Sequence, residues 1–261
     1  MIRVSAVTRR EDDGLLALLN CLAEGDRPHP PLSGRPGRAP NDVPATRAGL
    51  SLLTGPSFVL DLGTTLAGRV ILTGRTVLYV DGANAFDPYI LSALAKDAGQ
   101  PPKAAMQRLY LTRAFTCHQL ETLIVERLPS AIARYHPGLV VISGWSHLFH
   151  DENVPAREAF RLFENTARRI HALAEAGQPI LATHPEEPVT PRLKPLREIL
   201  TRAADAVARF REEEGLILII PEKPSDPYGS RSLVMSQDDC RPWIRGRHHQ
   251  ELPAAYPWTG R

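Results

Sequence analysis

Residues 63–70 read GTTLAGRV and have the glycine spacing of a phosphate-binding loop, G-x-x-x-x-G-K-[ST]. In such a loop the lysine contacts the terminal phosphates of a nucleotide, and the Ser or Thr hydroxyl binds Mg²⁺. Here the lysine position is Arg69, which keeps the positive charge, and the hydroxyl position is Val70, which has no oxygen. The pattern indicates the remnant of a phosphate-binding loop; chance similarity in a short strand–turn–helix is the alternative. The candidate nucleotide-binding positions of this stretch are Gly63, Thr64, Thr65, Gly68, Arg69 and Val70.

The C-terminal segment, residues 240–261, interleaves basic and aromatic side chains. Arginines suit contacts to a nucleic-acid backbone, and aromatic rings suit stacking on single-stranded bases. The same composition suits a tail that docks on its own domain or on a partner protein. The candidate DNA-binding residues here are Arg241, Trp243, Arg245 and Arg247.

Two other groups of residues invite a chemical interpretation. His147, His150, Asp151 and Glu152 are close together in the chain and could hold a divalent ion, but they lack a rigid ligand spacing such as HExxH. Cys117 beside His118 suggests a thiol nucleophile, yet a helix start with Thr116 as N-cap and a partly buried Cys explains the pair without chemistry. We therefore expect no metal site and no catalytic residue in either group.

Composition predicts a globular protein with one large or two small domains. The chain has 261 residues, of which 43% are hydrophobic, and a formal net charge of +2. No apolar run approaches the roughly 18 residues that a membrane-spanning helix needs, and the N-terminal residues become charged before a signal-peptide core could form. The three cysteines are far apart and suit reduced thiols. We expect a cytoplasmic location and no membrane partner.

The order of elements predicts where ligands would bind. We expect strands at 57–63, 76–82, 138–145, 178–184 and 215–223. Helical patterns cover 88–99, 117–135 and 155–177, and a short helix from about Thr65 to Thr73 ends at Gly74 as its C-cap. Strand–helix alternation predicts an α/β fold with a mainly parallel sheet covered on both faces and ligands at the carboxyl ends of the strands. A phosphate could meet the amides at the start of the short helix near Thr65.

The chain divides into four parts on this pattern. Residues 1–25 include a helix at 14–25, and residues 26–50 are a linker rich in Pro, Gly and Arg. The core covers residues 51–238, and the basic and aromatic tail covers residues 239–261.

Several core segments, in this order, resemble the ATPase core of RecA-type recombinases, most closely the archaeal RadA and eukaryotic branch. They are VLYVDGANAFDPYIL, LTRAFTCHQLETLI, HPGLVVISGWSHLF, GQPILATH and ADAVARFREEEGLILIIPEKPSDPYGSRSLVM. The resemblance covers roughly residues 57–238, and its most distinctive part is RAFT followed by HQLETL. It implies a RecA-like P-loop-type fold.

Within this resemblance, the residues that carry ATP chemistry are missing. The family has D-x-E-x-x-F after a core strand, with the glutamate positioning the attacking water; Asp81 and Phe86 match, but the glutamate position is Ala83. The family's metal-supporting aspartate corresponds to Ser143, and its polar Asn-Gln pair corresponds to His-Pro at 184–185. Without a metal ligand and a water-orienting carboxylate, most of the electrostatic stabilisation of phosphoryl transfer is lost. The resemblance thus implies no cofactor, or weakly bound ATP and Mg²⁺.

The resemblance also implies two loops near DNA. Residues 150–158 are acidic and suit phosphate poorly, whereas residues 184–198 begin acidic and end with Arg192, Lys194 and Arg197. These three cations could give salt-dependent binding to phosphates. A solvated loop leading into a helix is the alternative.

Three functional hypotheses follow. The first is a recombinase paralogue, deficient in ATP hydrolysis, that serves recombination or repair beside single-stranded DNA and a catalytic RecA-like paralogue or further copies of itself. The second is an active ATPase with a variant loop, in which Arg69 replaces the lysine and Asp81 binds the metal. The third is a protein-interaction scaffold outside DNA metabolism.

Overall fold

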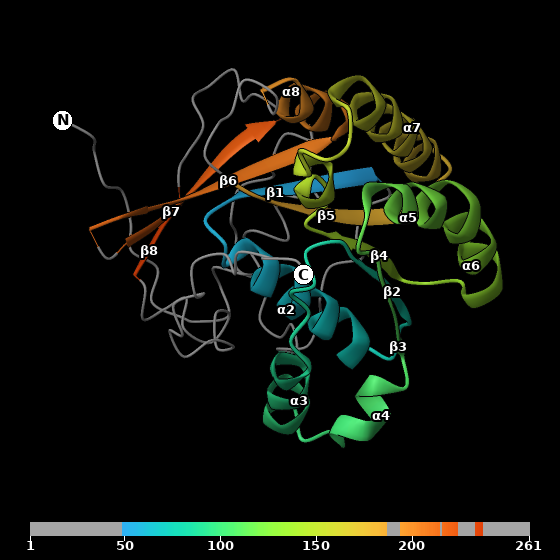
Figure 1. Cartoon of the computed structure of the whole chain (residues 1–261). Helices are drawn as coiled ribbons and strands as arrows, with labels where there is room; N and C mark the ends of the chain where they lie inside the picture. Colours follow the sequence, from blue (N-terminus) through green and yellow to red (C-terminus); the bar gives the residue numbers. More distant parts are fainter. Residues whose placement is uncertain (1–48, 187–193, 215, 224–232, 237–261) are drawn as a thin grey trace, which may run out of the picture.

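The computed structural model describes residues 49–186, 194–214, 216–223 and 233–236 (Figure 1). Within these residues, eight strands form one sheet in the order β3-β2-β4-β5-β1-β6-β7-β8. Pairing is parallel from β3 to β6, and β7 runs antiparallel to both of its neighbours. The fold is therefore α/β with a mostly parallel sheet, as the strand–helix alternation predicts.

Each strand is short, and the central ones are buried on both faces. The strands are β1 (Gly49–Gly55), β2 (Val77–Asp81), β3 (Leu109–Arg113), β4 (Leu139–Ser143), β5 (Pro179–Pro185), β6 (Ala206–Glu213), β7 (Leu216–Lys223) and β8 (Leu233–Ser236). All residues of β2 and β4 are buried, which explains why their sequences are continuous apolar runs.

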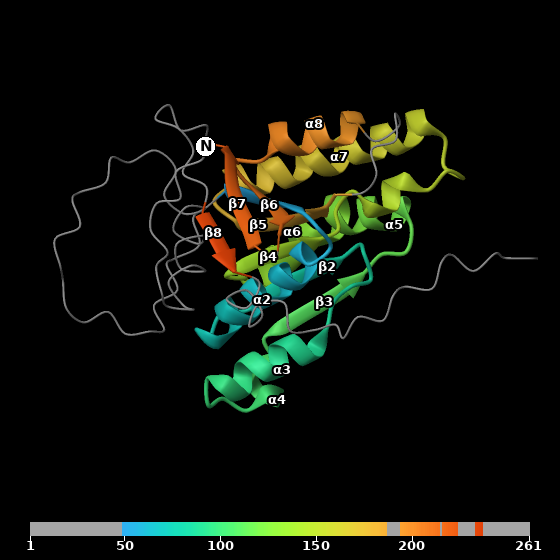
Figure 2. The ribbon, with the colours of Figure 1, turned by 90° about the vertical axis from the view of Figure 1, so that its left-hand side faces the viewer.

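Helices cover both faces of the sheet (Figure 2). One hydrophobic cluster joins the sheet to α2 (Val59–Leu72), α3 (Pro88–Asp97) and α4 (Pro102–Met106). The other cluster joins the opposite face to α5 (Cys117–Thr122), a π-helical turn (Leu123–Arg127), α6 (Leu128–Tyr135), α7 (Ala156–Glu175) and α8 (Lys194–Ala203). A short 3₁₀ helix, His147–His150, follows β4.

The prediction of a strand at 57–63 is wrong. Residues Val59–Leu72 form helix α2, and the strand before it is Gly49–Gly55, whose first two residues we assigned to the linker. Twelve of the fourteen residues of α2 are buried, so the helix has no polar face to reveal its period. The predicted end of this helix is off by one residue: the helix ends at Leu72, its C-cap is Thr73, and Gly74 follows the cap with φ +86° and an amide that donates to Ile71 O at 2.9 Å.

The predicted strands at 76–82, 138–145, 178–184 and 215–223 are confirmed as β2, β4, β5 and β7. The sequence pattern missed β3, β6 and β8 and helices α4 and α8, of which β3 is a largely exposed edge strand without a continuous apolar run. The predicted helix at 14–25, most of the linker at 26–50 and the tail at 239–261 lie outside the described residues. Within the described part of the chain, no helix is long and apolar enough to cross a membrane.

Candidate nucleotide site at the carboxyl edge of the sheet

The connection between β1 and α2 is short and internally bonded. Ligands of open α/β sheets bind beyond the carboxyl ends of the strands, often against a helix N-terminus. Here only Pro56, Ser57 and Phe58 separate β1 from α2. The amide of Val59 donates to Pro56 O at 3.0 Å, that of Leu60 to Ser57 O at 3.1 Å, and that of Leu62 to Phe58 O at 2.9 Å. These amides are therefore already used by the turn and the helix.

Two side chains further disfavour an anion at this helix start. The ring of Phe58 packs edge-on against Phe210 of β6, with 5.8 Å between the ring centroids. Asp61, which is buried, lies in the first turn of α2 and places a carboxylate where the helix dipole would otherwise attract a phosphate. The start of α2 is thus packed with apolar rings and carries an acidic residue.

All of GTTLAGRV lies inside α2. Arg69 is ten residues beyond Val59, which places it roughly 15 Å along the helix axis from the helix start. Both glycines serve packing, since a Cβ at Gly63 would lie 2.9 Å from Thr183 Cγ2 and one at Gly68 would lie 2.6 Å from Leu94 Cδ1. The prediction that the helix starts near Thr65, where its amides could meet a phosphate, is therefore wrong.

The hydroxyls of this stretch also have internal roles. Thr64 Oγ1 lies 3.0 Å from the Tyr79 hydroxyl, which comes from the middle of β2. Thr65 is buried in the same helix, as is Val70, which occupies the hydroxyl position of the phosphate-binding pattern. Burial raises the pKa of Tyr79 to about 12, so the phenol stays protonated and links α2 to the sheet.

The raised pKa of Tyr79 predicts a loss of stability in alkali. Above pH 10 the unfolded tyrosine loses its proton while the folded one keeps it until about pH 12, so the free energy of unfolding falls across this window. The slope from this residue is at most about 1.4 kcal/mol per pH unit. Tyr79→Phe costs about 1 kcal/mol near neutral pH, through the lost hydrogen bond, but lacks this alkaline loss. Urea denaturation of both proteins should show a constant difference below pH 10. Above pH 10 the wild-type protein should lose this advantage and become the less stable of the two before pH 12.

Asp81, at the end of β2, organises the following turn. Its Oδ1 accepts from the Ala85 amide at 3.1 Å, and its Oδ2 accepts from the Phe86 amide at 3.0 Å and from Arg113 Nε at 3.3 Å. The carboxylate is fully buried. Asp81 is therefore satisfied by the fold itself, which explains the residue without a metal.

The turns after β2 and β4 pack closely against each other. The amide of Gly82 donates to the carbonyl of Ser143, which is fully buried, at 2.9 Å. Gly144 has φ +63°, and a Cβ there would collide with the Cβ of Ala83. Ala83 and Ser143, where the resemblance predicted lost carboxylates, are thus small side chains in a tight backbone contact.

A row of polar side chains crosses the sheet nearby. Thr54 of β1 is in register with His184 of β5 on one side and with Arg209 of β6 on the other. His184 is buried, and its Nδ1 lies 2.5 Å from Ser146 Oγ. Sequence reasoning singled out His184 alone, because only strand register brings Thr54 and Arg209 beside it.

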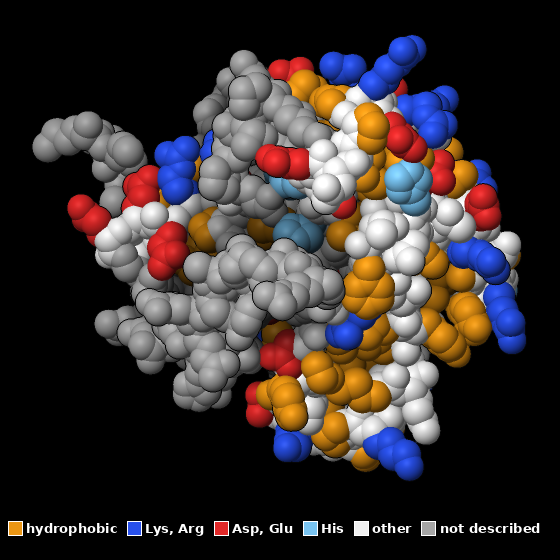
Figure 3. Space-filling model, in the orientation of Figure 1, with side chains coloured by type: hydrophobic (Ala, Val, Ile, Leu, Met, Phe, Trp, Pro, Cys, Tyr) orange, Lys and Arg blue, Asp and Glu red, His pale blue; other side chains and the backbone are white. Residues whose placement is uncertain are grey.

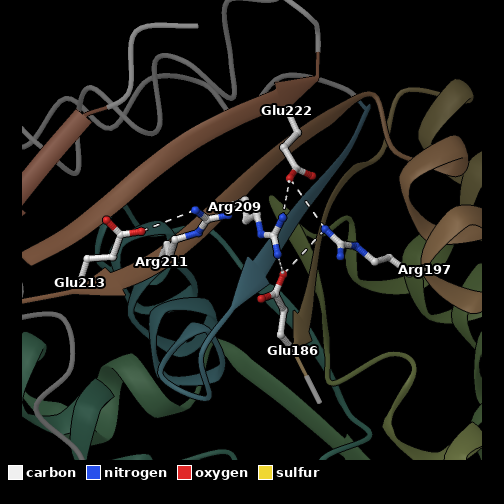
Figure 4. Close-up of polar contacts among 6 residues, drawn as sticks. All are labelled: Glu186, Arg197, Arg209, Arg211, Glu213 and Glu222. Carbon is white, nitrogen blue, oxygen red and sulfur yellow. Dashed lines mark hydrogen bonds and ion pairs between the residues drawn. The ribbon is translucent and has the colours of Figure 1, made fainter. Parts of the chain in front are cut away.

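Three further charged residues, Glu186, Arg197 and Glu222, surround Arg209 at the end of this row (Figure 4). Arg209 Nη2 lies 2.7 Å from Glu186 Oε1, and its Nη1 lies 3.4 Å from Glu222 Oε1. Arg197 of α8 lies 3.8 Å from both carboxylates. Two arginines and two glutamates balance in charge, which weakens the attraction of Arg197 for a DNA phosphate.

The remaining DNA-binding candidates cannot be placed in this way. Lys194 is the first residue of α8. The side chain of Lys194 is outside the described part of the structure. So are the other candidates: Arg192, Arg241, Trp243, Arg245 and Arg247. Their contact with DNA stays a prediction.

The surroundings of Cys117 do not favour a thiol nucleophile. Cys117 is buried, and burial raises the pKa of its thiol. Its Sγ lies 3.6 Å from His118 Nδ1, and His118 Nε2 lies 2.9 Å from Glu158 Oε1. As predicted, Thr116 caps the helix, accepting from the Gln119 amide at 3.2 Å. A protonated, buried thiol at a helix start is a poor nucleophile.

Across the described ranges, no three His, Cys, Asp or Glu side chains are placed to hold a metal ion. No protein-family model and no curated protein matches this sequence.

Proposed function

We propose that this chain is a RecA-like recombinase paralogue that does not hydrolyse ATP and acts as an accessory or DNA-binding subunit in recombination or repair. The order of the segments that resemble the recombinase core supports this, as does the mostly parallel sheet with helices on both faces. In a fold of this kind, a chain without a nucleotide site of its own can still contribute a surface to a neighbour.

The observation that best supports the loss of ATP hydrolysis is the short, internally bonded connection between β1 and α2, residues 56–58. Phosphoryl transfer needs backbone donors around the phosphates, a metal ligand and a group that orients the attacking water. The Val59, Leu60 and Leu62 amides at the start of α2 already donate within the turn and the helix. Asp81 accepts from two amides and from Arg113. Ala83 and Ser143 have no carboxylate.

Two results together test this function. The melting temperature of the full chain should be unchanged by millimolar Mg-ATP if no nucleotide site remains. A nucleotide that did bind, at 100 times its Kd, would add about 2.7 kcal/mol of stability and raise the melting temperature. Fluorescence anisotropy should show binding of a labelled single-stranded oligonucleotide that weakens as salt rises. Replacing Arg241, Arg245 and Arg247 together by alanine should weaken that binding, whereas Arg197→Ala, which removes a side chain paired to Glu186 and Glu222, should change it little.

The controls separate the rival functions. A rise in melting temperature with Mg-ATP that Arg69→Ala abolishes would support an active ATPase with a variant loop. Mg²⁺ alone and ADP serve as matched additions. No nucleotide effect and no oligonucleotide binding at low salt would instead support a protein-interaction scaffold.

A further inference from the structure

Two tyrosine rings stack near the start of β3. Tyr110 of β3 and Tyr135, the last residue of α6, have their ring centroids 4.0 Å apart, with 30° between the ring planes. The guanidinium carbon of Arg134 lies 5.3 Å from the centroid of the Tyr135 ring. Tyr110 is still 42% exposed, although one side of its ring meets Tyr135. The pair therefore holds an aromatic ring at the surface in a fixed orientation.

The pairing of the strands brings two more arginines to the same place. Arg75 precedes β2, Arg108 precedes β3 and Gly138 precedes β4. The Val77 amide donates to Arg108 O at 2.9 Å. The Gly138 amide donates to Thr76 O at 2.8 Å, and a Cβ on Gly138 would collide with the guanidinium group of Arg75. Because β2, β3 and β4 begin side by side here, we call the following residues the amino-edge surface: Arg75, Arg108, Tyr110, Arg134 and Tyr135.

The positive charge of the amino-edge surface is not neutralised. Arg75, Arg108 and Arg134 are exposed, and none of them forms an ion pair with a carboxylate of the described residues. The segments that meet here, 72–77, 98–110 and 128–139, contain four Lys or Arg residues and no Asp or Glu. Figure 3 shows basic side chains over α6 and near α4, with apolar but no acidic side chains between them, where β3 lies in Figure 1. This surface therefore attracts anions.

Arginines at the opposite, carboxyl edge of the sheet are already paired. Arg113 is bonded to Asp81 at 3.3 Å, and Arg209 is bonded to Glu186 at 2.7 Å. A phosphate at that edge would compete with these carboxylates for the guanidinium groups. At the amino edge it would meet arginines that no carboxylate of the described residues holds.

Arginines beside an exposed aromatic ring fit single-stranded nucleic acid. Guanidinium groups pair with phosphates, and unpaired bases stack on aromatic rings with little sequence preference. An acidic peptide would satisfy the arginines but has no base to stack on Tyr110. A duplex keeps its bases inside and would meet the arginines alone.

We propose that the amino-edge surface binds single-stranded nucleic acid. One base stacks on Tyr110, which Tyr135 holds in place, and the adjoining phosphates contact Arg75, Arg108 and Arg134. This inference goes beyond the proposed function, whose candidate DNA contacts lie in residues 184–198 and 239–261, because the amino-edge surface is built from other residues.

Fluorescence anisotropy of the full chain with two labelled probes tests the stacked base. The probes are an oligothymidylate and an abasic strand of the same length, which carry the same phosphates and differ in their bases alone. Wild type should bind the oligothymidylate about tenfold or more tightly than the abasic strand. Tyr110→Ala should bind the two probes nearly equally. The comparison is repeated in a tail variant, in which alanine replaces Arg241, Trp243, Arg245 and Arg247.

Arg108→Ala and Arg134→Ala test the phosphate contacts. Each should weaken the binding of both probes and lower the slope of log affinity against log salt concentration by about 0.7. Arg211→Ala is the matched control, because Arg211 is exposed on β6 and lies 3.5 Å from Glu213. It should leave affinity and slope nearly unchanged. Thermal melts check that each variant keeps the fold.

Three results would overturn the proposal. The first is equal affinity of wild type for the two probes, and the second is an effect of Arg108→Ala and Arg134→Ala no larger than that of Arg211→Ala. The third is loss of all binding in the tail variant, which would leave the proposed function intact and assign the DNA contact to the tail. Binding that persists in the tail variant and is lost on adding Arg108→Ala would support the amino-edge surface, whether or not the tail binds DNA.

Discussion

Asp81→Ala should lower the free energy of unfolding by about 3–5 kcal/mol, because it removes a buried charge that satisfies three donors. The Ala85 and Phe86 amides and Arg113 Nε would all lose their acceptor. Urea denaturation, followed by circular dichroism, measures the loss directly. The effect should appear without nucleotide or metal, since every partner of this carboxylate belongs to the chain.

Asp87→Ala is the matched control for this prediction. Asp87 is the N-cap of α3 and, among the described residues, accepts from the Tyr89 amide alone, at 2.8 Å and in an exposed position. Its replacement should cost about 1 kcal/mol. A contrary result would have two parts: Asp81→Ala lowers the free energy of unfolding no more than Asp87→Ala, and it abolishes a Mg-ATP-dependent rise in melting temperature. Asp81 would then be a metal ligand, and the result would support the variant-ATPase hypothesis.

Gly55→Ala should cost about 3 kcal/mol or more, because backbone strain and steric overlap add at this position. Gly55 ends β1 with φ +147°, a conformation that L side chains rarely adopt. A Cβ there would lie 2.6 Å from Phe210 O and 2.8 Å from Phe210 Cβ, both in the neighbouring strand β6. Relief would require β1 and β6 to separate, and thermal or urea denaturation would register the cost.

Gly74→Ala separates the two contributions. Gly74 has φ +86° but nothing within 4 Å of the position of a Cβ, so its replacement should cost only about 1 kcal/mol of backbone strain. Equal losses at the two glycines would show that β1 and β6 can open beside Gly55. The start of α2 would then have room for a ligand, which would contradict the interpretation that the connection between β1 and α2 excludes one.

These two substitutions bear on function as well as on stability. Gly55 ends β1 and Asp81 ends β2, so both lie at the carboxyl edge of the sheet, where a nucleotide would bind in a fold of this class. Large losses without ligand would mean that both residues are engaged in the fold itself. That result would favour an accessory that acts through DNA or through a partner surface.

The sequence by itself determined the fold class and much of the local structure. Continuous apolar runs identified β2, β4, β5 and β7. The first three are buried on both faces and need no polar alternation, whereas β7 is only partly buried. The N-cap Thr116 and the helix-ending glycine Gly74, one residue after the C-cap Thr73, were also readable, since helix ends depend on the side chain and the backbone of a few adjacent residues. The missing carboxylates at Ala83 and Ser143 are facts of the sequence alone.

Tertiary structure decided what the stretch GTTLAGRV does. Local pattern could not separate a strand from a helix at 57–63, because α2 is buried nearly all round and has no amphipathic period. Its glycines fit a phosphate-binding spacing but are used for contact with Thr183 and Leu94, which are distant in the chain. Strand register likewise brought together His184, Thr54 and Arg209, and the strand order left β3 at the edge. These features depend on which segments become neighbours in space, and the spacing of residues along the chain does not record that.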